Sequence, residues 1–527
     1  MKKAFLLALI ISLFCQVGYS QIANKSGVTV TWGLKIKKTR DVDNIIGSDD
    51  NGIYVLKHKK SDLIFEQYNI NNLILAKTAI FPLRASDKKE NIESIFFMDN
   101  EMFLFTSFID KTTKKNTLLA RKIDKSTLSP TSKPVTIGQI DFGESRWGNR
   151  GSFDYHISND QSKLLIYYNL PYKKGEKEKM GYIVFNKNLE KLWEKEASLP
   201  YEDQQFKVEN YKVDNNGNVY LLGVYFKDKR ASKKLGEANY GYKIFTYFDF
   251  GEKTDEYDLN FGDKFITDMQ FDINVKMDFV CAGFYSEKGS YGMKGTFYMS
   301  IDHKTKQIMN KSSKEFSFAE ITQNMSAKEM KKAEKRKMKG KKVELDDYDI
   351  DDIIMRSDGG ALIIAEQYRV DVTTTTTTNA QGFTTTTTHY TYNYNDILVV
   401  NISPSGEIDW VQKIVKRQRT TDDGGYFSSY AKIIKGNKIY FIFNDNIKNI
   451  INPAEKGVYA FNKSKRKSIA SIVELSADGS QTKSALFSSK EAQMMIRPKI
   501  SGIINDNEMV LFGFWGRGQQ IAKLTFN

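Results

Sequence analysis

The chain has 527 residues, of which 13% are aromatic and 27% charged, and its formal net charge is +14 at pH 7. It contains only two cysteines, which excludes a disulfide framework and requires a fold that rests on a large apolar core. The positive charge favours an anionic neighbour, such as a membrane surface, an acidic polymer or an acidic protein face.

The first twenty residues have the pattern of a secretory signal peptide. Two lysines follow Met1, residues 4–14 are apolar, and small residues precede an expected cleavage before Gln21. The apolar segment is too short to span a bilayer, and the bulky residue before Cys15 argues against lipidation. We therefore predict an exported protein of the periplasm or of the outer membrane, and we do not expect nucleic acid as a partner.

One local pattern recurs eight times: an apolar strand, a turn rich in Asp, Asn and Gly, and a second, strongly apolar strand. Turns of this composition between apolar segments are typical of β-hairpins. The eight segments are SDDNGIYVL (48–56), MDNEMFLF (98–105), SNDQSKLLIY (158–167), VDNNGNVYLL (213–222), DINVKMDFV (272–280), SDGGALII (357–364), KGNKIYFIF (435–443) and NDNEMVLF (505–512).

Each of these hairpins except the last is followed by a second one, for example YIVFNKNLEKLWEKE (182–196). Two hairpins in each unit predict a four-stranded antiparallel sheet, and such sheets arranged radially form a β-propeller. The fold class is therefore all-β, with eight four-stranded blades as the expected number. Seven blades are the alternative, because the unit that follows Lys435 is irregular.

The two ends of the chain predict how the ring closes. The last strand, IAKLTF (521–526), corresponds to the third strand of a unit, with no fourth strand after it. Near the start, WGLKIKK (32–38) resembles WVQKIVK (410–416), which is expected to be the fourth strand of unit six. We predict that the N-terminal strand completes the last blade, so that residues 21–527 form one propeller domain without an exposed sheet edge.

The segment from Gly406 to Trp410 fits the Gly-x-x-x-Trp step of quinoprotein-like eight-bladed propellers, which the sequence distantly resembles. The content of Lys, Ile and Asn, together with cleavage before Gln21, resembles exported proteins of flavobacterial type. The first resemblance implies an architecture. It covers one repeat and implies no quinone, and we expect no cofactor.

A constellation for catalysis is missing from the sequence. No two of the four histidines, His58, His156, His303 and His389, lie within five residues of each other, so no local metal pair exists. Turn chemistry explains the Asp-rich turns without calcium, and Cys281 lies in an apolar run typical of a buried core. We expect neither catalytic nor metal-binding residues.

A non-catalytic protein is therefore favoured over an enzyme. Carboxylates from different blades, alone or with His156, leave open a polysaccharide-active enzyme with its site at the propeller channel. A carbohydrate-binding surface protein is a further alternative.

Residues 319–350 interrupt the regular unit. Ser326 and Glu329 have the spacing of a capping box that begins a helix, and Gly340 is expected to end it. Residues 328–342 carry nine basic and two acidic side chains, and residues 343–353 carry six acidic ones. One interpretation is a solvated helix whose charge the acidic stretch partly balances. The other is a basic arm that docks on an anionic surface through Lys331, Lys332, Lys335 and Arg336.

The second insertion, residues 368–394, contains TTTTTTNAQGFTTTTTHYTYNY and is predicted to form a long β-hairpin. Threonine has a high strand propensity and suits a ribbon wet on both sides. A loop at residues 379–382 would project the ribbon by about 40 Å. It would also place Asp371 opposite Tyr390 and Arg369 opposite Tyr392, with Tyr394 on the same face. A glycosylated spacer is the alternative, although the stretch lacks proline.

These features predict an exported scaffold protein, an accessory subunit of an outer-membrane-associated complex for assembly, secretion or motility. The expected partner is an envelope protein or an anionic surface. The protein itself is expected to be peripheral to the membrane, and the sequence predicts no particular oligomeric state. The candidate partner-binding residues are Arg369, Asp371, Tyr390, Tyr392, Tyr394, Lys331, Lys332, Lys335 and Arg336.

Overall fold

The structure of the chain is a computed structural model. It describes residues 24, 26–37, 42–59, 62–83, 89–143, 150–171, 175–227, 233–234, 237–259, 261, 264–274, 276–286, 292–323, 325–451 and 457–527. The predicted signal peptide lies outside the described residues and stays a prediction.

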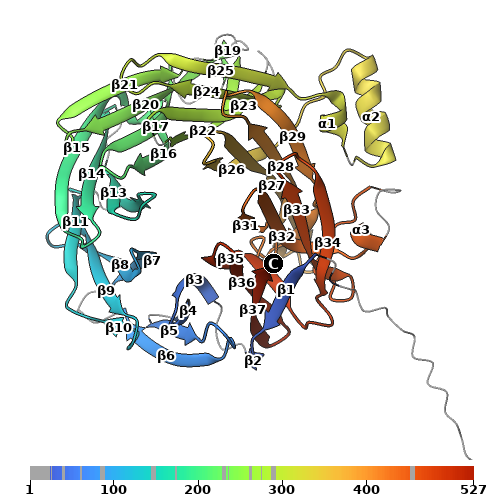
Figure 1. Cartoon of the computed structure of the whole chain (residues 1–527), viewed down its shortest axis with the longest axis horizontal. Helices are drawn as coiled ribbons and strands as arrows, with labels where there is room; N and C mark the ends of the chain where they lie inside the picture. The colour runs from blue at the N-terminus through green and yellow to red at the C-terminus, as the bar shows by residue number, and fades with distance from the viewer. Residues whose placement is uncertain are drawn as a thin grey trace, which may run out of the picture.

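The described residues form a ring of eight antiparallel sheets, each built on four strands, so the chain is an eight-bladed β-propeller as predicted (Figure 1). We number the blades in chain order. Blade one consists of β3 (Val42–Asp49), β4 (Gly52–Lys59), β5 (Asp62–Tyr68) and β6 (Leu75–Pro82), and blade two of β7 (Asn91–Met98), β8 (Glu101–Asp110), β9 (Lys115–Asp124) and β11 (Val135–Asp141), with the short β10 (Ser129–Pro130). Blade three consists of β12 (Ser152–Ile157), β13 (Lys163–Asn169), β14 (Lys177–Asn186) and β15 (Lys191–Glu202). Blade four consists of β16 (Phe206–Val213), β17 (Val219–Phe226), β20 (Tyr240–Phe248) and β21 (Lys253–Leu259).

Blades five to eight complete the ring. Blade five consists of β22 (Phe265–Ile273), β23 (Phe279–Ser286), β24 (Gly295–Ile301) and β25 (Ile308–Glu315), and blade six of β26 (Tyr348–Met355), β27 (Ala361–Thr378), β28 (Thr384–Ile402) and β29 (Ile408–Ile414), with β30 (Gln418–Thr421). Blade seven consists of β31 (Ala431–Lys435), β32 (Lys438–Asn446), β33 (Ser468–Ser476) and β34 (Gln481–Ser488). Blade eight consists of β35 (Met495–Asn505), β36 (Glu508–Trp515), β37 (Gly518–Phe526) and β1 (Val28–Trp32), with β2 (Ile36–Lys37). Outside the blades lie β18 (Lys233–Lys234), β19 (Glu237–Ala238), the 3-10 turn η1 (Asp203–Gln205), α1 (Phe318–Thr322), α2 (Ala327–Met338) and α3 (Lys448–Ile451).

All eight predicted hairpin turns join the first and second strands of a blade. In blade one, the turn lies between β3 and β4, where the Asp49 carboxylate accepts hydrogen bonds from the backbone amides of Asn51 (2.9 Å) and Gly52 (3.2 Å). An aspartate at the start of a tight turn satisfies amides that would otherwise lack a partner. Local turn chemistry therefore sets the repeat. The first strands of the blades lie on the inside of the ring, and the fourth strands lie on its outside (Figure 1).

The ring closes as predicted, because the N-terminal strand completes the last blade. β1 pairs antiparallel with β37 over its whole length, with Val28 opposite Phe526 and Trp32 opposite Ala522. Blade eight therefore has its outer strand from one end of the chain and its three inner strands from the other.

The hydrophobic core is divided among the joints between blades. The described residues form eight buried clusters, and each draws its main members from two neighbouring blades, including one between blade eight and blade one. Cys281, expected in the core, is fully buried in the cluster between blades four and five. A blade thus covers its apolar faces only by packing against both neighbours.

Phe526 tests this closure, because it lies in the joint between blades seven and eight and pairs with β1. Its ring centroid lies 4.7 Å from that of Tyr440 in blade seven. We expect Phe526→Ala to lower the free energy of unfolding by about 3 to 5 kcal/mol, the usual cost of emptying a buried aromatic site. Denaturant titration measures this loss. Ile503→Ala, at an exposed position of the same blade, is the control and should change stability by less than about 0.5 kcal/mol.

Candidate functional site: two insertions and the cleft between them

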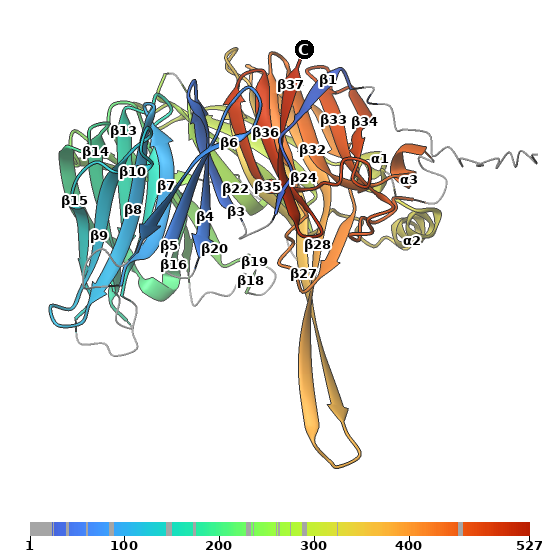
Figure 2. The same cartoon turned by 90° about the horizontal axis from the view of Figure 1, so that it is seen from below.

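The second insertion is a two-stranded ribbon that continues β27 and β28 well beyond blade six. It leaves the ring on the face away from the C-terminal residue and stands clear of the body (Figure 2). Pairs of threonines face each other across the ribbon, with Oγ1 atoms 3.4 Å apart at Thr374 and Thr388 and 3.3 Å apart at Thr378 and Thr384. The predicted long hairpin is therefore present.

The register of the ribbon differs from the prediction by one residue. The Asn379 amide donates to the Phe383 carbonyl (3.0 Å), so the loop proper is Ala380 to Gly382, with Gly382 at a positive φ of 81°. A three-residue loop with glycine in its last position is a favoured hairpin connection. The predicted loop of four residues, which paired Thr378 with Phe383, was wrong, because Phe383 belongs to the closing pair and Thr378 faces Thr384.

The shift moves the predicted interaction residues to opposite faces. Tyr390 pairs with Val372 and Tyr392 with Val370, whereas Asp371 pairs with Thr391 and Arg369 with Asn393. Since neighbouring strand residues point to opposite sides, the tyrosines share one face and the Arg369 and Asp371 pair lies on the other. The expected mixed face of tyrosine, arginine and aspartate was therefore wrong.

The charged face is held by contacts within the chain. The Arg369 guanidinium contacts the carboxylates of Asp371 (2.9 Å) and Asp347 (3.3 Å), and the Asn393 amide also donates to Asp371 (2.9 Å). The pKa of Asp371 is lowered, chiefly by the hydrogen bond from Arg369. The Arg369 side chain remains 58% exposed, so the pair is both ordered and open to solvent.

The aromatic face is only partly open. Tyr394 is 6% exposed: its hydroxyl accepts a hydrogen bond from Lys499 (2.7 Å), and its ring lies 4.6 Å from that of Tyr368. Tyr394 therefore supports the ribbon's base instead of offering a contact surface. By contrast, Tyr390 is 45% exposed and its cross-strand partner Val372 is 58% exposed. This pair forms the accessible apolar contact near the base.

The base of the ribbon has a brace that the sequence did not reveal. β30 adds a short third strand beside Thr391 to Tyr394 of β28. After it, the Asp422 carboxylate accepts a hydrogen bond from the Tyr390 amide (2.8 Å) and lies 2.6 Å from Nδ1 of His389. Asp422 stands in a turn-like stretch about thirty residues from these partners, and no local pattern links the two segments.

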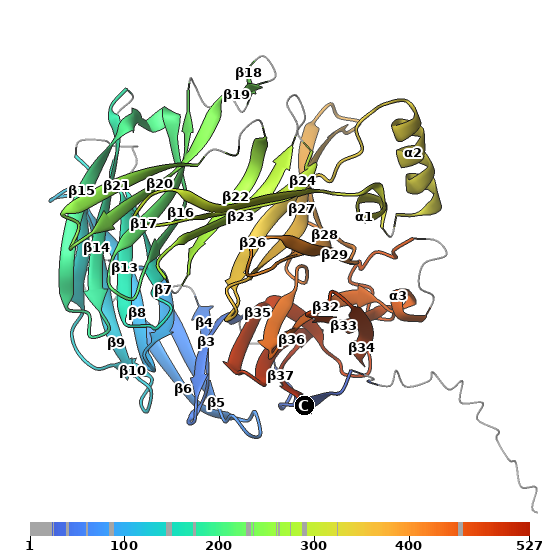
Figure 3. The same ribbon diagram turned by 45° about the horizontal axis from the view of Figure 1, so that its top comes forward.

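The first insertion contains the predicted helix, α2, with Ser326 as its N-cap. The Ser326 hydroxyl accepts from the Glu329 amide (3.3 Å), and the Glu329 carboxylate accepts from the Ser326 amide (2.9 Å), which confirms the capping box. A shorter helix, α1, precedes it, and both lie at the outer rim of the ring beside blades five and six (Figure 3). Gly340 follows the helix at a positive φ of 63°.

The exposed side of α2 is strongly basic. Ala333 is its one buried residue, and the side away from Ala333 carries Lys328, Lys331, Lys332, Lys335 and Lys339, all exposed. In the part of the chain that the structure describes, these lysines form no ion pair. Arg336 lies nearer the body and donates to the Lys342 carbonyl (2.9 Å). Of the four predicted docking residues, the three lysines therefore share one open face.

The second half of the acidic stretch that follows belongs to the propeller itself. From Tyr348 onward it is β26, the innermost strand of blade six, so Asp349, Asp351 and Asp352 lie on the inner side of the ring. Lys432 of blade seven forms an ion pair with Asp352 (3.1 Å). These aspartates therefore do not neutralise the lysine face of α2.

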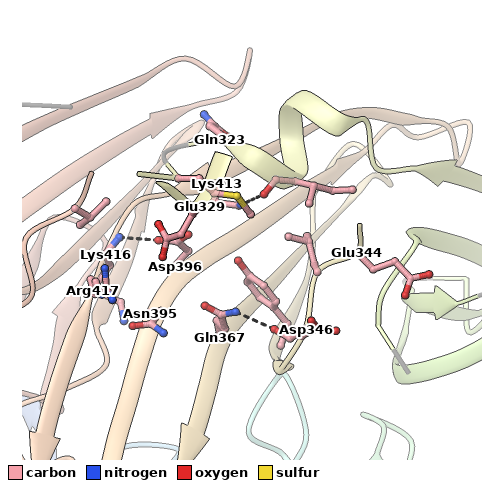
Figure 4. A pocket seen from close by; sticks show the side chains of 15 residues that line it. Gln323, Glu329, Glu344, Asp346, Gln367, Asn395, Asp396, Lys413, Lys416 and Arg417 are labelled. Atoms are coloured by element: carbon pink, nitrogen blue, oxygen red, sulfur yellow. Dashed lines mark hydrogen bonds between the residues drawn. The ribbon is translucent and has the colours of Figure 1, made fainter. Parts of the chain in front are cut away.

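A cleft of about 310 Å³ lies between the helical insertion and the base of the ribbon (Figure 4). Arg417, Lys416 and Asn395 line one end, whereas Glu344 and Asp346 line the other. The pKa of Asp346 is raised, first by burial and then by the neighbouring charges of Asp347 and Glu344. The cleft is polar, and it also has a carboxylate at its basic end, because Asp396 lies beside Lys416 and accepts a hydrogen bond from the Lys416 backbone amide (3.1 Å).

Lys416, which lines the cleft, forms a buried ion pair. Lys416 Nζ lies 2.5 Å from Glu366 Oε1, and the Ser429 hydroxyl donates to the other oxygen of Glu366 (2.7 Å). Burial lowers the pKa of Lys416, although the attraction of Glu366 opposes that shift. Gln418 accepts from the Ser429 amide (2.7 Å) and donates to the Asn444 carbonyl (2.9 Å), which links blades six and seven.

The inner strands of the ring carry carboxylates with raised pKa values. Burial raises the pKa of Asp268 on β22 and of Asp351 on β26 to about 6 each. Asp268 accepts a hydrogen bond from the Ile350 amide (2.9 Å), and Asp351 accepts one from the Tyr430 hydroxyl (2.6 Å). Nearby charges contribute less than burial to both shifts.

His156 is held as a neutral side chain between blades three and four. Its Nδ1 accepts a hydrogen bond from the Val213 amide (3.2 Å), and burial together with the charge of Lys212 lowers its pKa to about 4. In the described part of the chain, no group of three or more His, Cys, Asp or Glu side chains has a metal-binding arrangement. None of the described helices is long and apolar enough to cross a membrane.

The fold defines the chain as a β-propeller protein. No family model and no curated protein matches the chain. Similar solved structures include the WD40 domain of SCAP from fission yeast (TM-score 0.40, 7% identity, 96% of this chain and 97% of that chain), an uncharacterised protein from Listeria monocytogenes (0.34, 9%, 92% and 97%) and the Dos1 propeller (0.31, 13%, 52% and 60%). At these values the likeness carries no argument about function, and the fold rests on the sheets described above.

Lys416 gives a test of the joint beneath the cleft. We expect Lys416→Met to lower the free energy of unfolding by about 3 to 5 kcal/mol, because it leaves the Glu366 carboxylate buried without its cation. Lys438→Met is the matched control: it breaks the ion pair with Glu474, which is much more exposed, and should cost less than about 1 kcal/mol. Equal losses in the two variants, measured by denaturant titration, would contradict the role assigned to Lys416.

Proposed function

We propose that this chain is a non-catalytic exported scaffold, an accessory subunit of an outer-membrane-associated protein complex. The setting would be the periplasm or the outer membrane of a flavobacterial type of cell, and the complex would serve assembly, secretion or motility. The observation that carries the proposal is that two insertions leave the regular ring and present a projecting ribbon and an open lysine face.

The two features suit different parts of one binding event. The lysine face of α2 would attract an acidic protein surface from a distance and speed association. The ribbon would then contact the partner through the backbone edge of β28 and through the exposed pair of Val372 and Tyr390 near its base. Arg369 and Asp371, on the opposite face, would supply polar contacts. The expected partner is an envelope protein rather than nucleic acid.

Capture from envelope extracts tests the ribbon. A variant in which residues 374–388 are replaced by a short Asn-Gly turn keeps Thr373 paired with His389 and should lose the partners that the wild-type chain retains, because the projecting strands are gone while the braced base remains. Unfolding temperature checks that the propeller is intact. Phe383→Ala, which changes only the exposed tip, should retain the same partners. An unchanged partner list in the shortened variant would contradict this part of the proposal.

Charge reversal tests the lysine face. The triple variant Lys331→Glu, Lys332→Glu and Lys335→Glu should weaken binding to the captured partner at least tenfold, and should flatten its dependence on salt. The matched control reverses Lys111, Lys133 and Lys276, which are exposed elsewhere on the ring and give the same change in net charge. If both triple variants bind equally weakly, net charge alone explains the effect and the lysine face has no special role. Titration at two salt concentrations provides the measurement.

A polysaccharide-active enzyme is the second candidate, because Asp268 and Asp351 have pKa values of about 6 on inner strands. Carboxyl groups in this range can donate a proton near neutral pH. If glycan hydrolysis exists, we expect it to fall as pH rises above 6 and to drop at least 100-fold in Asp268→Asn or Asp351→Asn. Asp478→Asn, in an exposed turn, is the control. Glycan binding without turnover would instead indicate the carbohydrate-binding alternative.

A further inference from the structure

The outer edge of β27 is an unpaired strand edge for most of the ribbon's length. Within the described residues, β26 pairs with β27 only as far as Gln367, and the last backbone contact is the hydrogen bond from the Tyr368 amide to the Asp347 carbonyl (2.8 Å). The edge of β28 is shorter, because β30 and Asp422 cover its base as far as Tyr390. The most accessible backbone donors and acceptors therefore lie on β27.

The hydrogen bonds at both ends of the ribbon show which residues point toward that edge. The Asn379 amide points inward to Phe383, whereas the Tyr390 amide points outward to Asp422. Because the direction alternates along an antiparallel pair, the backbone groups of Val372, Thr374, Thr376 and Thr378 point outward. The close Thr374–Thr388 and Thr378–Thr384 side-chain contacts agree, since pairs without backbone hydrogen bonds approach more closely.

This edge lacks the features that keep strand edges apart in most proteins. Natural edges carry lysine, proline, bulges or very short strands. The segment from Val372 to Thr378 contains no charge, no proline and no glycine, and β27 and β28 pair across it without a bulge. It is also its own antiparallel complement, because six consecutive threonines read the same in both directions. The ribbon already contains such a pairing, threonine against threonine, between its own two strands.

We propose that β27 pairs antiparallel with β27 of a second copy of this chain, which forms a two-fold dimer through the ribbons. A two-fold axis beside Thr375 places Thr374 opposite Thr376 of the second copy, so the outward-pointing backbone groups meet. The result is a four-stranded sheet, which is stable where an isolated two-stranded ribbon is only marginal. This inference goes beyond the proposed function, because it assigns the outer edge of β27 to a second copy.

The geometry also reduces the repulsion between two basic bodies. Antiparallel pairing puts the propellers at opposite ends of the shared sheet, with the ribbon bases about 40 Å apart at the usual rise of a strand. That distance exceeds the Debye length of about 8 Å at physiological ionic strength. The dimer should therefore form at physiological and high salt and weaken only near 10 mM salt. Docking by the lysine face has the opposite salt dependence, so the failure of one proposal is distinguishable from the failure of the other.

Cysteine cross-linking of the chain from residue 21 onward tests the axis, since Cys281 is buried. Thr375→Cys places two thiols directly across the axis, where a disulfide can form, and should give a covalent dimer under mild oxidation. Thr377→Cys is the matched control on the same face of the same strand. It puts the thiols about 13 Å apart along the strand and should not cross-link. Cross-linking of both variants to the same extent indicates random collision and would overturn the proposal.

Sedimentation equilibrium tests the backbone pairing. Wild-type chain should show a monomer–dimer equilibrium, and Thr376→Pro should weaken it at least tenfold, because proline removes an outward-pointing amide but no hydrogen bond inside the ribbon. Thr376→Val keeps the amide and should dimerise as the wild type does. An unchanged unfolding temperature in all three shows that the propeller is intact. A wild-type chain that stays monomeric at physiological and high salt, or a Thr376→Pro variant that dimerises normally, would overturn the proposal.

Discussion

The packing of each blade against its two neighbours is the constraint on which this structure depends. Eight apolar clusters lie at the eight joints, so removing one blade would expose two apolar faces. The ring must therefore close, and two contacts close it. β1 pairs with β37 within blade eight, and an apolar cluster packs blade eight against blade one. Pairing of β1 with β37 places Val28 and Phe526 in one cluster between blades seven and eight.

Because the joints hold the ring, segments that leave a blade can vary without loss of the core. β27 and β28 use their inner halves for blade six and extend their other halves into solvent. The joint between blades six and seven, next to the ribbon, contains the buried pair of Lys416 and Glu366 with its hydrogen-bonded neighbours. Such pairs add little net stability but demand one arrangement of their partners. The ribbon's base is thus tied to a joint with a fixed geometry.

The repeat pattern predicted the ring because it depends on local signals: turn residues such as Asp49 and Gly52, and apolar segments on either side. The capping box at Ser326 was predictable for the same reason. The ribbon's register was not, because six identical threonines carry no information about pairing, and Gly382 shortened the loop by one residue. The brace from Asp422 and the pairing of Lys416 with Glu366 join segments distant in sequence, which no local pattern reports.

Because the threonines of the ribbon are identical, contacts at its two ends determine the register in which its strands pair. At the tip, the Asn379 side chain accepts hydrogen bonds from the amides of Gln381 (3.1 Å) and Phe383 (2.9 Å), which fixes the loop. At the base, Tyr394 is fixed by Lys499, and Asp422 holds the Tyr390 amide. The threonines between need only be uncharged, β-forming and tolerant of water on both faces. The same tolerance leaves the outer edge of β27 without a sequence-specific partner, and so open to another strand of the same kind.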